Sequence, residues 1–328
     1  MFIRDYLHRK SCVLLGATLR AAAVLAAVLC ASAALGAKPD PTPQIAAALP
    51  ARVTVQPKQP RKLLLFNTKR HHAAAAAVAA KAIEMMGKKT GVWTTTISDD
   101  PAVFEAEGLK GFDAVCINNT DPFFGDMPAR MTSEEREAAE AVAKRREHAL
   151  LAYVRGGGGV IGFHGTGDNR SPALQELLGC GNFAGHPWSE EVGIRVDDPQ
   201  HALTRSFGGQ SFSVVEEIYT FANKEQPDFR KQIRVLLTLD MTRTAPKGKR
   251  ADQDYIVAWV RKVGEGRLFY SSLGHYAHIF LEPKILRFYQ DGIQFALGDL
   301  EADVRTSAEV GIAPPSVTVP APGPKTKK

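Results

Sequence analysis

Short apolar runs alternate with helical segments over the first half of this chain of 328 residues. The apolar runs have the length and the β-branched or aromatic content of buried strands, and the segments between them have helical composition. Strands are predicted at 62–66, 92–97, 113–117 and 160–163, and helices at 73–86, 133–155 and 172–178. Strands that alternate with helices form βαβ units, so this half predicts an α/β fold with a parallel sheet and helices on both faces.

The second half of the chain follows a different pattern. Five strand-like runs succeed one another before a helix returns at 283–297. These strands are predicted at 192–196, 212–221, 233–239, 255–260 and 268–271. The whole therefore predicts a flavodoxin-like, mostly parallel sheet with a mixed C-terminal half. Ligands of such sheets bind at the carboxyl ends of the strands, so the loops that directly follow strands are the candidate functional segments.

Two helix boundaries are marked in the sequence. Thr132 and Glu135 have the spacing of a capping box, which predicts the start of the helix that ends at Arg155 before four glycines. The alanine-rich helix that begins at Ala73 is expected to end at Gly87, because glycine often follows the last helical turn.

Residues 1–37 have the features of a secretory signal peptide. Basic residues end at Arg20, an uncharged run covers 21–36, and small residues suited to cleavage lie at 31–33. A transmembrane anchor is the alternative, but the run is shorter than the ~20 residues that cross a bilayer. We therefore expect an exported protein, periplasmic or extracellular, with no membrane span after cleavage.

Proline-rich segments flank the predicted domain. Residues 38–60 are expected to be a linker, and residues 301–328 are expected to be a basic, flexible tail. The folded α/β domain is therefore predicted at 61–300.

The net charge of +6 does not indicate a nucleic-acid partner. Half of it comes from residues 1–37, which hold four basic side chains and one acidic one, and the predicted domain is close to neutral. Capture of a phosphate backbone needs a concentrated basic surface, so we expect no nucleic-acid binding. The sequence leaves the oligomeric state open, a homo-oligomer included.

Two cysteines, Cys116 and Cys180, lie outside the predicted signal peptide. They could form one disulfide in an exported protein. The alternative is that each is a small core residue, since Cys116 lies inside an apolar strand-like run. Neither reading provides a cysteine site for zinc or an iron–sulfur cluster.

Histidines occur in three loops that follow predicted strands. His71 and His72 follow the first strand, His164 lies in the glycine-rich turn 162–168, and His275 follows the run at 268–271. A neutral imidazole at the edge of a sheet can act as a base, an acid or a metal ligand. The alternative for His164 is a histidine that only orders its loop by hydrogen bonds.

Other polar and aromatic residues near these loops are candidate substrate ligands. Trp188 could stack on a sugar ring beside His186, although an ordinary packed tryptophan is the alternative. The polar residues after His164 could bind a polyol or could merely order the turn and cap the next helix: Thr166, Asp168, Asn169 and Arg170.

Glu216 and Glu217 interrupt an apolar strand. Side chains alternate along a strand, so only one of the two is expected to face inward. An inward carboxylate could contact a histidine or a sugar hydroxyl, whereas an outward one would protect an exposed edge from aggregation.

Familiar cofactor motifs are missing from the sequence. No GxGxxG segment follows a strand and opens a helix, and neither GxxxxGK[ST] nor HExxH occurs. The sequence therefore predicts no nucleotide cofactor.

Four motifs in order give the sequence a family resemblance. They are GGGVIGFHGT at 157–166, FAGHP at 183–187, EEIY at 216–219 and GRLFYSSLGH at 266–275. In this combination the chain resembles the ThuA-like family, named for trehalose utilisation. The resemblance implies a class I glutamine amidotransferase-like α/β fold. It also implies a role in the metabolism of trehalose and related glucosides, including their 3-keto derivatives.

The same resemblance excludes one activity. Amidotransferases of this fold carry a nucleophilic cysteine in the turn after the central strand. By this resemblance, the residue of this chain that corresponds to that cysteine is His164. Cys116 lies on an earlier strand and Cys180 beyond the next helix. Without a thiol in the turn, hydrolysis of glutamine through a thioester has no nucleophile.

We therefore expect an exported carbohydrate enzyme with His164, His275 and Glu217 as catalytic residues. Elimination, hydration or hydrolysis by acid–base chemistry is expected, and the partner is a small carbohydrate. A sugar-binding or scaffold protein that has lost catalysis is the alternative. A divalent metal, zinc or similar, could be held by histidines, the candidates being His72, His164, His186 and His275.

Overall fold

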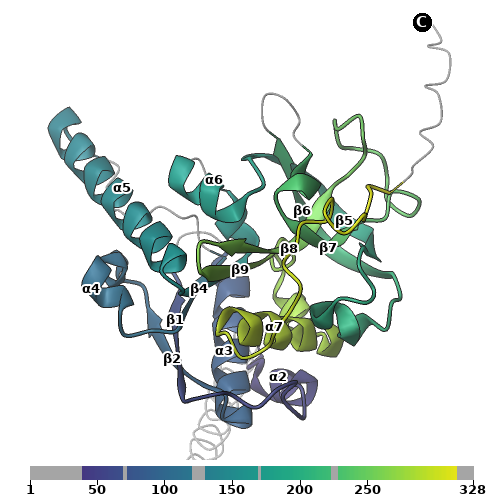
Figure 1. The fold of residues 1–328 in the computed structure, drawn as a ribbon, viewed down its shortest axis with the longest axis horizontal. Coiled ribbons are helices and arrows are strands. Elements are labelled where there is room, and N and C mark those ends of the chain that lie inside the picture. The colour runs from purple at the N-terminus through teal and green to yellow at the C-terminus, as the bar shows by residue number, and fades with distance from the viewer. Residues whose placement is uncertain (1–38, 69–71, 120–129, 169–170, 223–227, 316–328) are drawn as a thin grey trace, which may run out of the picture. The chain divides into compact units, whose positions relative to one another are not determined.

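The computed structural model describes residues 39–68, 72–119, 130–168, 171–222 and 228–315 (Figure 1). Contacts divide the chain into residues 1–43 and residues 44–328. Of the first unit only residues 39–43 are described, and they contain the start of helix α2 (Thr42–Ala48). The predicted signal peptide lies outside the described residues.

Nine strands form one sheet in the second unit, in the order β2-β1-β3-β4-β9-β8-β7-β5-β6. Neighbours from β2 to β9 pair in parallel, and neighbours from β9 to β6 pair antiparallel. The sheet is therefore mixed, with a parallel half in flavodoxin-like order. The strands are β1 (Arg61–Phe66), β2 (Trp93–Ser98), β3 (Ala114–Asn118), β4 (Gly159–Phe163), β5 (Asn182–Val196), β6 (Phe212–Ala222), β7 (Arg234–Leu239), β8 (Ile256–Val263) and β9 (Gly266–Ser271).

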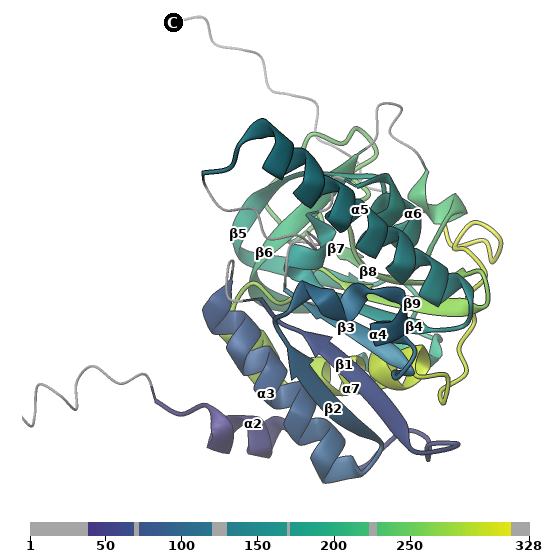
Figure 2. The same ribbon diagram turned by 90° about the vertical axis from the view of Figure 1, so that its left-hand side faces the viewer.

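Helices cover both faces of the parallel half, as the sequence predicts (Figure 2). Helices α3 (Ala73–Thr90) and α7 (Pro283–Ala296) share one apolar core with the sheet, and α5 (Ser133–Arg155) and α6 (Pro172–Leu178) share the other. Successive strand residues alternate between the two cores, because strand side chains point to opposite faces. The shorter helices are α4 (Ala106–Leu109), η1 (Pro101–Phe104), η2 (His164–Gly167), η3 (Ala202–Phe207), η4 (Phe229–Lys231) and η5 (Ala277–Leu281).

The two predicted helix boundaries have different outcomes. The capping box is confirmed, since the Thr132 side chain accepts the backbone N–H of Glu135 and the Glu135 side chain accepts the backbone N–H of Thr132. The predicted end of α3 is wrong: the helix continues past Gly87 and is capped by Gly91, whose φ is 70°. Gly87 serves close packing instead, because a Cβ there would lie 2.5 Å from Nε1 of Trp93.

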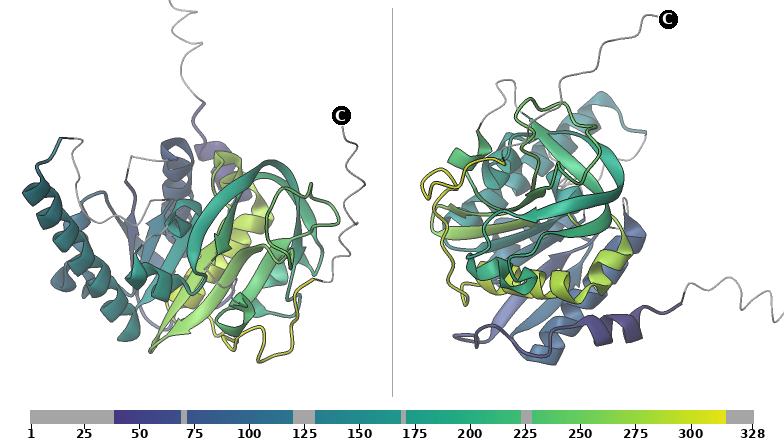
Figure 3. Two further views of the ribbon diagram at one scale, coloured as in Figure 1. Left: turned by 90° about the horizontal axis from the view of Figure 1, so that it is seen from above. Right: turned by 90° about the vertical axis from the view of Figure 1, so that its right-hand side faces the viewer.

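The two longest strands, β5 and β6, bend strongly and form an antiparallel pair (Figure 3). Their bend brings β6 against strands that are not its neighbours in the sheet. The Phe221 ring lies 5.4 Å from the Trp259 ring of β8, and the backbone N–H of Tyr219 donates to Oγ of Ser272 after β9. Strand β6 thereby reaches the carboxyl ends of the parallel strands.

Residues 44–60 are not a flexible linker, so that prediction is wrong. Ile45 is fully buried in the core, and the Thr54 hydroxyl donates to the Asp291 carboxylate of α7. Gln294, also in α7, donates to the carbonyl oxygen of Val55 at 2.6 Å. The segment is tied to α7 by polar contacts that its proline-rich composition does not reveal.

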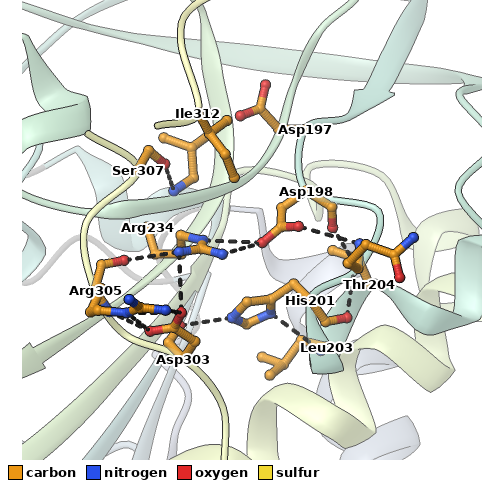
Figure 4. A network of polar contacts seen from close by, with 12 residues as sticks. Asp197, Asp198, His201, Leu203, Thr204, Arg234, Asp303, Arg305, Ser307 and Ile312 are labelled. Carbon is orange, nitrogen blue, oxygen red and sulfur yellow. Dashed lines mark hydrogen bonds and ion pairs between the residues drawn. The ribbon is translucent and has the colours of Figure 1, made fainter. Parts of the chain in front are cut away.

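The prediction of a flexible tail is also wrong for residues 301–315. Ser307 is fully buried, its Oγ accepts the backbone N–H of Val235 at 2.9 Å, and its own N–H donates to Ile233. Arg234 links Asp198 to Asp303 in the same polar network (Figure 4). The domain therefore extends through 44–315, and residues 316–328 lie outside the described part.

Both described cysteines are free and buried. Burial raises the pKa of the Cys116 and Cys180 thiols, so neither is a ready nucleophile. The prediction of core cysteines is confirmed, and their disulfide does not form in this structure. Within the residues described here, no helix has the length and apolar character needed to cross a membrane.

Candidate active site

His164 begins helix η2 directly after β4, at the carboxyl end of the parallel sheet. Its φ is 35°, a left-handed conformation that side chains other than glycine rarely adopt. Its ring is fully buried, and Nδ1 lies 2.8 Å from the carbonyl oxygen of Ser272. The turn and the hydrogen bond together fix which way the other ring nitrogen points, and strained backbone of this kind occurs often at functional sites.

His164, His275 and Glu217 form a compact cluster. Nε2 of His164 lies 3.2 Å from Nδ1 of His275. Oε1 of Glu217 lies 3.4 Å from the first of these nitrogens and 3.3 Å from the second. The loop after β4, the loop after β9 and strand β6 thus bring together the three residues that the sequence analysis predicts to be catalytic.

Two more predicted histidines lie beside this cluster. Nδ1 of His186 lies 3.2 Å from Oε2 of Glu217, and about half of the His186 side chain is exposed. The His72 ring lies 4.9 Å from the His164 ring and 4.7 Å from the His275 ring. His72, like His164, has a left-handed backbone, with a φ of 52°. Three of the metal candidates, His164, His186 and His275, therefore contact the Glu217 carboxylate, and His72 lies against the rings of two of them.

Burial and the neighbouring charged groups both shift the pKa values of Glu217 and His275. Burial raises the pKa of Glu217, but the hydrogen bond with His164 and the charge of His275 outweigh it, so the pKa lies below its usual range. Burial lowers the pKa of His275, and His164 lowers it further, against the effect of Glu217. Glu217 is thus held as a carboxylate, and His275 favours its neutral form.

Glu216 is fully buried and holds the loop that carries His275. Its carboxylate accepts the backbone N–H groups of Gly274 at 3.2 Å and His275 at 3.0 Å. Burial raises its pKa to about 8, although these N–H donors lower it. The expectation that only one of the two adjacent glutamates is inward is wrong. Glu216 holds loop backbone and Glu217 contacts the imidazoles, because β6 is buried on both faces at residues 216–219.

Two residues of the site were not predicted. Asn119, directly after β3, donates to the carbonyl oxygen of Gly274 at 2.7 Å and accepts the N–H of Gly165 at 3.1 Å. It therefore joins the two loops that carry His164 and His275. Tyr219 lies with its ring 4.1 Å from the His164 ring. The rule that favours loops after strands would have found Asn119. Tyr219 lies in the EEIY motif at 216–219, in which the sequence analysis assigns roles only to the glutamates.

Two predicted substrate ligands point elsewhere. Trp188 is fully buried and its Nε1 donates to the carbonyl oxygen of Ala245 at 2.6 Å, so the prediction of an exposed stacking ring is wrong. Thr166 is buried and its hydroxyl donates to the carbonyl oxygen of Ile117 at 2.7 Å. Thr166 orders the turn and offers no hydroxyl to a substrate.

The remaining predicted ligands lie at the margin of the described structure. Asp168 is half-buried at the end of η2, where its backbone N–H donates to Gly165. His71, Asn169 and Arg170 lie outside the described residues.

A cavity of about 410 Å³ opens beside His186. Its wall combines small, aromatic and cationic residues. The lining residues are Ala184, Gly185, His186, Pro187, Thr220, Phe221, Lys247, Gly248, Lys249, Arg250 and Tyr255. A cavity of this size accommodates a sugar-sized ligand, and His186 connects it to Glu217.

Comparisons with known proteins relate the chain to one family. A family model described as ThuA, trehalose utilisation, matches residues 62–296, which contain all the histidines and glutamates of the cluster. The structure of a ThuA-like protein from Bacteroides uniformis aligns with a TM-score of 0.55 at 21% identity, over 75% of this chain and 94% of that one. A ThuA-like protein from Parabacteroides merdae aligns with a TM-score of 0.49 at 14% identity, over 76% of this chain and 96% of that one. The search of curated proteins gave no match.

Proposed function

The chain belongs to the ThuA family of trehalose utilisation, and we propose that it is an enzyme acting on trehalose-like or 3-keto glucosides by acid–base chemistry. The observation that carries this proposal is the triangle of His164 Nε2, His275 Nδ1 and Glu217 Oε1, with sides of 3.2 to 3.4 Å. Proton donors and acceptors at this separation can exchange protons with one another and with a bound substrate.

A 3-keto group suits this set of residues. The carbonyl acidifies the hydrogen on the neighbouring C2, so a base can remove that proton. The electron pair then forms a C1–C2 double bond as the C1–O bond breaks, and the departing oxygen takes a proton from an acid. The glucoside is cleaved in this step, and addition of water at C1, with return of a proton to C2, would convert the enone to the free 3-keto sugar. We assign the base and acid roles to His164 and His275, with Glu217 orienting both rings.

Hydrolysis without an oxidised sugar fits the site less well. Glycoside hydrolysis generally uses two carboxylates on either side of the scissile bond. Of Glu216 and Glu217, only Glu217 contacts the imidazoles, because Glu216 is engaged by the backbone of the loop 274–276. This difference favours elimination over direct hydrolysis.

The purified chain incubated with trehalose and with 3-keto-trehalose in D₂O tests the proposal. Mass spectrometry should show conversion of the keto sugar, and NMR should show deuterium at C2 when a base exchanges that proton. Glu217→Gln keeps the side-chain shape and should abolish both signals. His148→Ala on the exposed surface of α5 is the matched control and should retain them.

A folded protein that binds the sugar but gives neither conversion nor exchange would contradict the enzyme proposal. Such a result would favour the alternative of a sugar-binding protein. We also propose export, on the basis of the basic and apolar pattern of residues 1–37, and detection of the protein in a periplasmic fraction would test it.

A further inference from the structure

His164 directs a ring nitrogen at a carboxylate. Its Nδ1 lies 2.8 Å from the Ser272 carbonyl oxygen, which can only accept a hydrogen bond. Nδ1 therefore carries the hydrogen, and in the neutral ring Nε2 carries a lone pair. This lone pair faces Oε1 of Glu217 at 3.4 Å. A cation between the two atoms holds them together: either a second proton on Nε2, which makes the hydrogen bond with Glu217 described above, or a metal ion.

The cluster has the dimensions of a metal site. A tetrahedral zinc ion holds nitrogen and oxygen ligands at about 2.0–2.1 Å, which places neighbouring ligand atoms about 3.3–3.4 Å apart. The three distances among His164 Nε2, His275 Nδ1 and Glu217 Oε1 are 3.2, 3.3 and 3.4 Å. These atoms can thus occupy three corners of one coordination tetrahedron with little movement.

His72 is the candidate for the fourth ligand of the coordination tetrahedron. Its ligand atom and those of His164 and His275 all lie within 4.8 Å of one another. This set is wider than a closed tetrahedron, so His72 would approach by a small rotation of its half-buried ring. A loose fourth ligand is also what an open catalytic site requires, because substrate or water must enter.

Neighbouring groups hold two of the ligands in place. The Ser272 carbonyl fixes the ring of His164, and His186 contacts the second oxygen of Glu217 at 3.2 Å. Metal-binding histidines usually donate their other ring N–H to a carbonyl or a carboxylate in this way. Imidazole ligands favour zinc, cobalt or nickel over magnesium and calcium, which prefer oxygen.

We propose that His164, His275 and Glu217, with His72 as the fourth ligand, bind one divalent transition-metal ion of the zinc class. The ion would polarise the sugar carbonyl and so acidify C2. Its role in turnover rests on the proposed function, whereas its binding does not. A ring nitrogen that holds the ion cannot also exchange a proton, so in the metal-loaded chain His164 and His275 would act as ligands in place of the base and acid roles assigned above.

The full-length chain, stripped with a chelator and dialysed, allows the test. Titration with Zn²⁺ alone in a calorimeter should give one ion per chain. Co²⁺ in its place should give the intense visible absorption of a four-coordinate nitrogen–oxygen site. Calorimetry and absorption both report binding without any substrate.

Variants assign the ligands. His164→Ala and His275→Ala should each weaken Zn²⁺ binding more than about 100-fold, beyond the 10–100-fold typical of outer partners. His186→Ala, which removes an outer partner of Glu217, should weaken it by about 10-fold. His148→Ala should bind as the parent does, and circular dichroism should show that each variant is folded.

Failure of a folded parent chain to bind one equivalent of Zn²⁺ or Co²⁺ would overturn the proposal. So would equal losses in His148→Ala and His164→Ala. The cation beside Glu217 would then be a second proton on His164, visible by ¹⁵N NMR. Turnover by the metal-free chain would overturn the role of the ion in turnover and leave the proposed acid–base function intact. Metal binding without turnover of any glucoside would contradict the proposed function and leave the proposed metal site intact.

Discussion

Nε2 of His164 lies 3.2 Å from Nδ1 of His275, although 111 residues separate them in the chain. The two rings follow β4 and β9, which are neighbours in the parallel half of the sheet. The contact therefore depends on the sheet order, and the rings can act as one unit on a substrate or an ion.

If the two histidines act as one unit, their losses should not add. We expect His164→Ala and His275→Ala each to reduce kcat/KM by about 10²–10⁴-fold, the range of a general acid or base. The double variant should be no slower than the worse single one, because either loss already disables the unit. Initial rates with 3-keto-trehalose measure this. Multiplication of the two losses would mean that the rings act independently.

Asn119 should act as a positioning residue. Asn119→Ala removes the hydrogen bonds to Gly274 and Gly165. Leaving these buried groups unpaired should lower the free energy of unfolding by about 1–3 kcal/mol. The variant should lose kcat with little change in KM, because the loops that carry His164 and His275 shift relative to each other. An unchanged kcat in a destabilised variant would show a purely structural role.

Arg230 should be critical for stability and unimportant for turnover. Its buried guanidinium contacts Asp197 at 2.6 Å and Asp254 at 2.8 Å. Arg230→Met would leave the buried Asp254 carboxylate without this cation and Asp197 with Arg195 alone, and unfolding in urea should require about 3–5 kcal/mol less. Arg305→Met, which breaks an exposed pair with Asp303, should change little. Equal effects of the two substitutions would contradict this assignment.

Asp291 should make stability depend on pH. Burial raises its pKa to about 6 from the ordinary 3.8, against the effects of Thr54 and Arg287. The folded chain thus holds this proton more tightly than the unfolded chain. The stability that the proton contributes is complete below the ordinary pKa and is lost as the pH rises through about 6.

Asp291→Asn removes this titration. The free energy of unfolding of the parent, relative to the variant, should rise by about 2 kcal/mol as the pH falls from about 7 to about 4. Urea unfolding of both proteins across that range measures the difference. Parallel curves would show that Asp291 keeps an ordinary pKa in the fold.

The sequence predicts the parallel half of the fold well, because its strands are apolar, short and separated by helices. It fails for residues 44–60, whose composition is proline-rich, and for residues 301–315, which precede a proline-rich end of the chain. Ile45 and Ser307 are fully buried by elements far away in the chain. Such long-range contacts leave no local pattern in the sequence. A segment that packs on the domain therefore cannot be distinguished by its sequence from a flexible one.

The candidate site could also be predicted only in part from the sequence. His164 and His275 could be predicted because they follow strands, whose carboxyl ends meet at one edge of the sheet. Trp188 and Thr166 lie in the right segments but face the interior, and the sequence does not give that direction. Glu217 reaches the histidines only because β6 bends over the sheet. This bend is a tertiary feature, and it produces no periodic pattern in the sequence.

The order of the strands in the sheet also determines at which stage of chain synthesis the site can form. Strand β4 has β9 as its partner, with Gly159 beside Arg267, so all of β5 to β8 must be synthesised before β4 loses its open edge. Until then His164 has neither the Ser272 carbonyl nor the His275 ring beside it. A nascent or truncated chain that stops before β9 would therefore contain most of the helices and strands but no complete catalytic centre. Assembly of the cluster marks the completion of the fold.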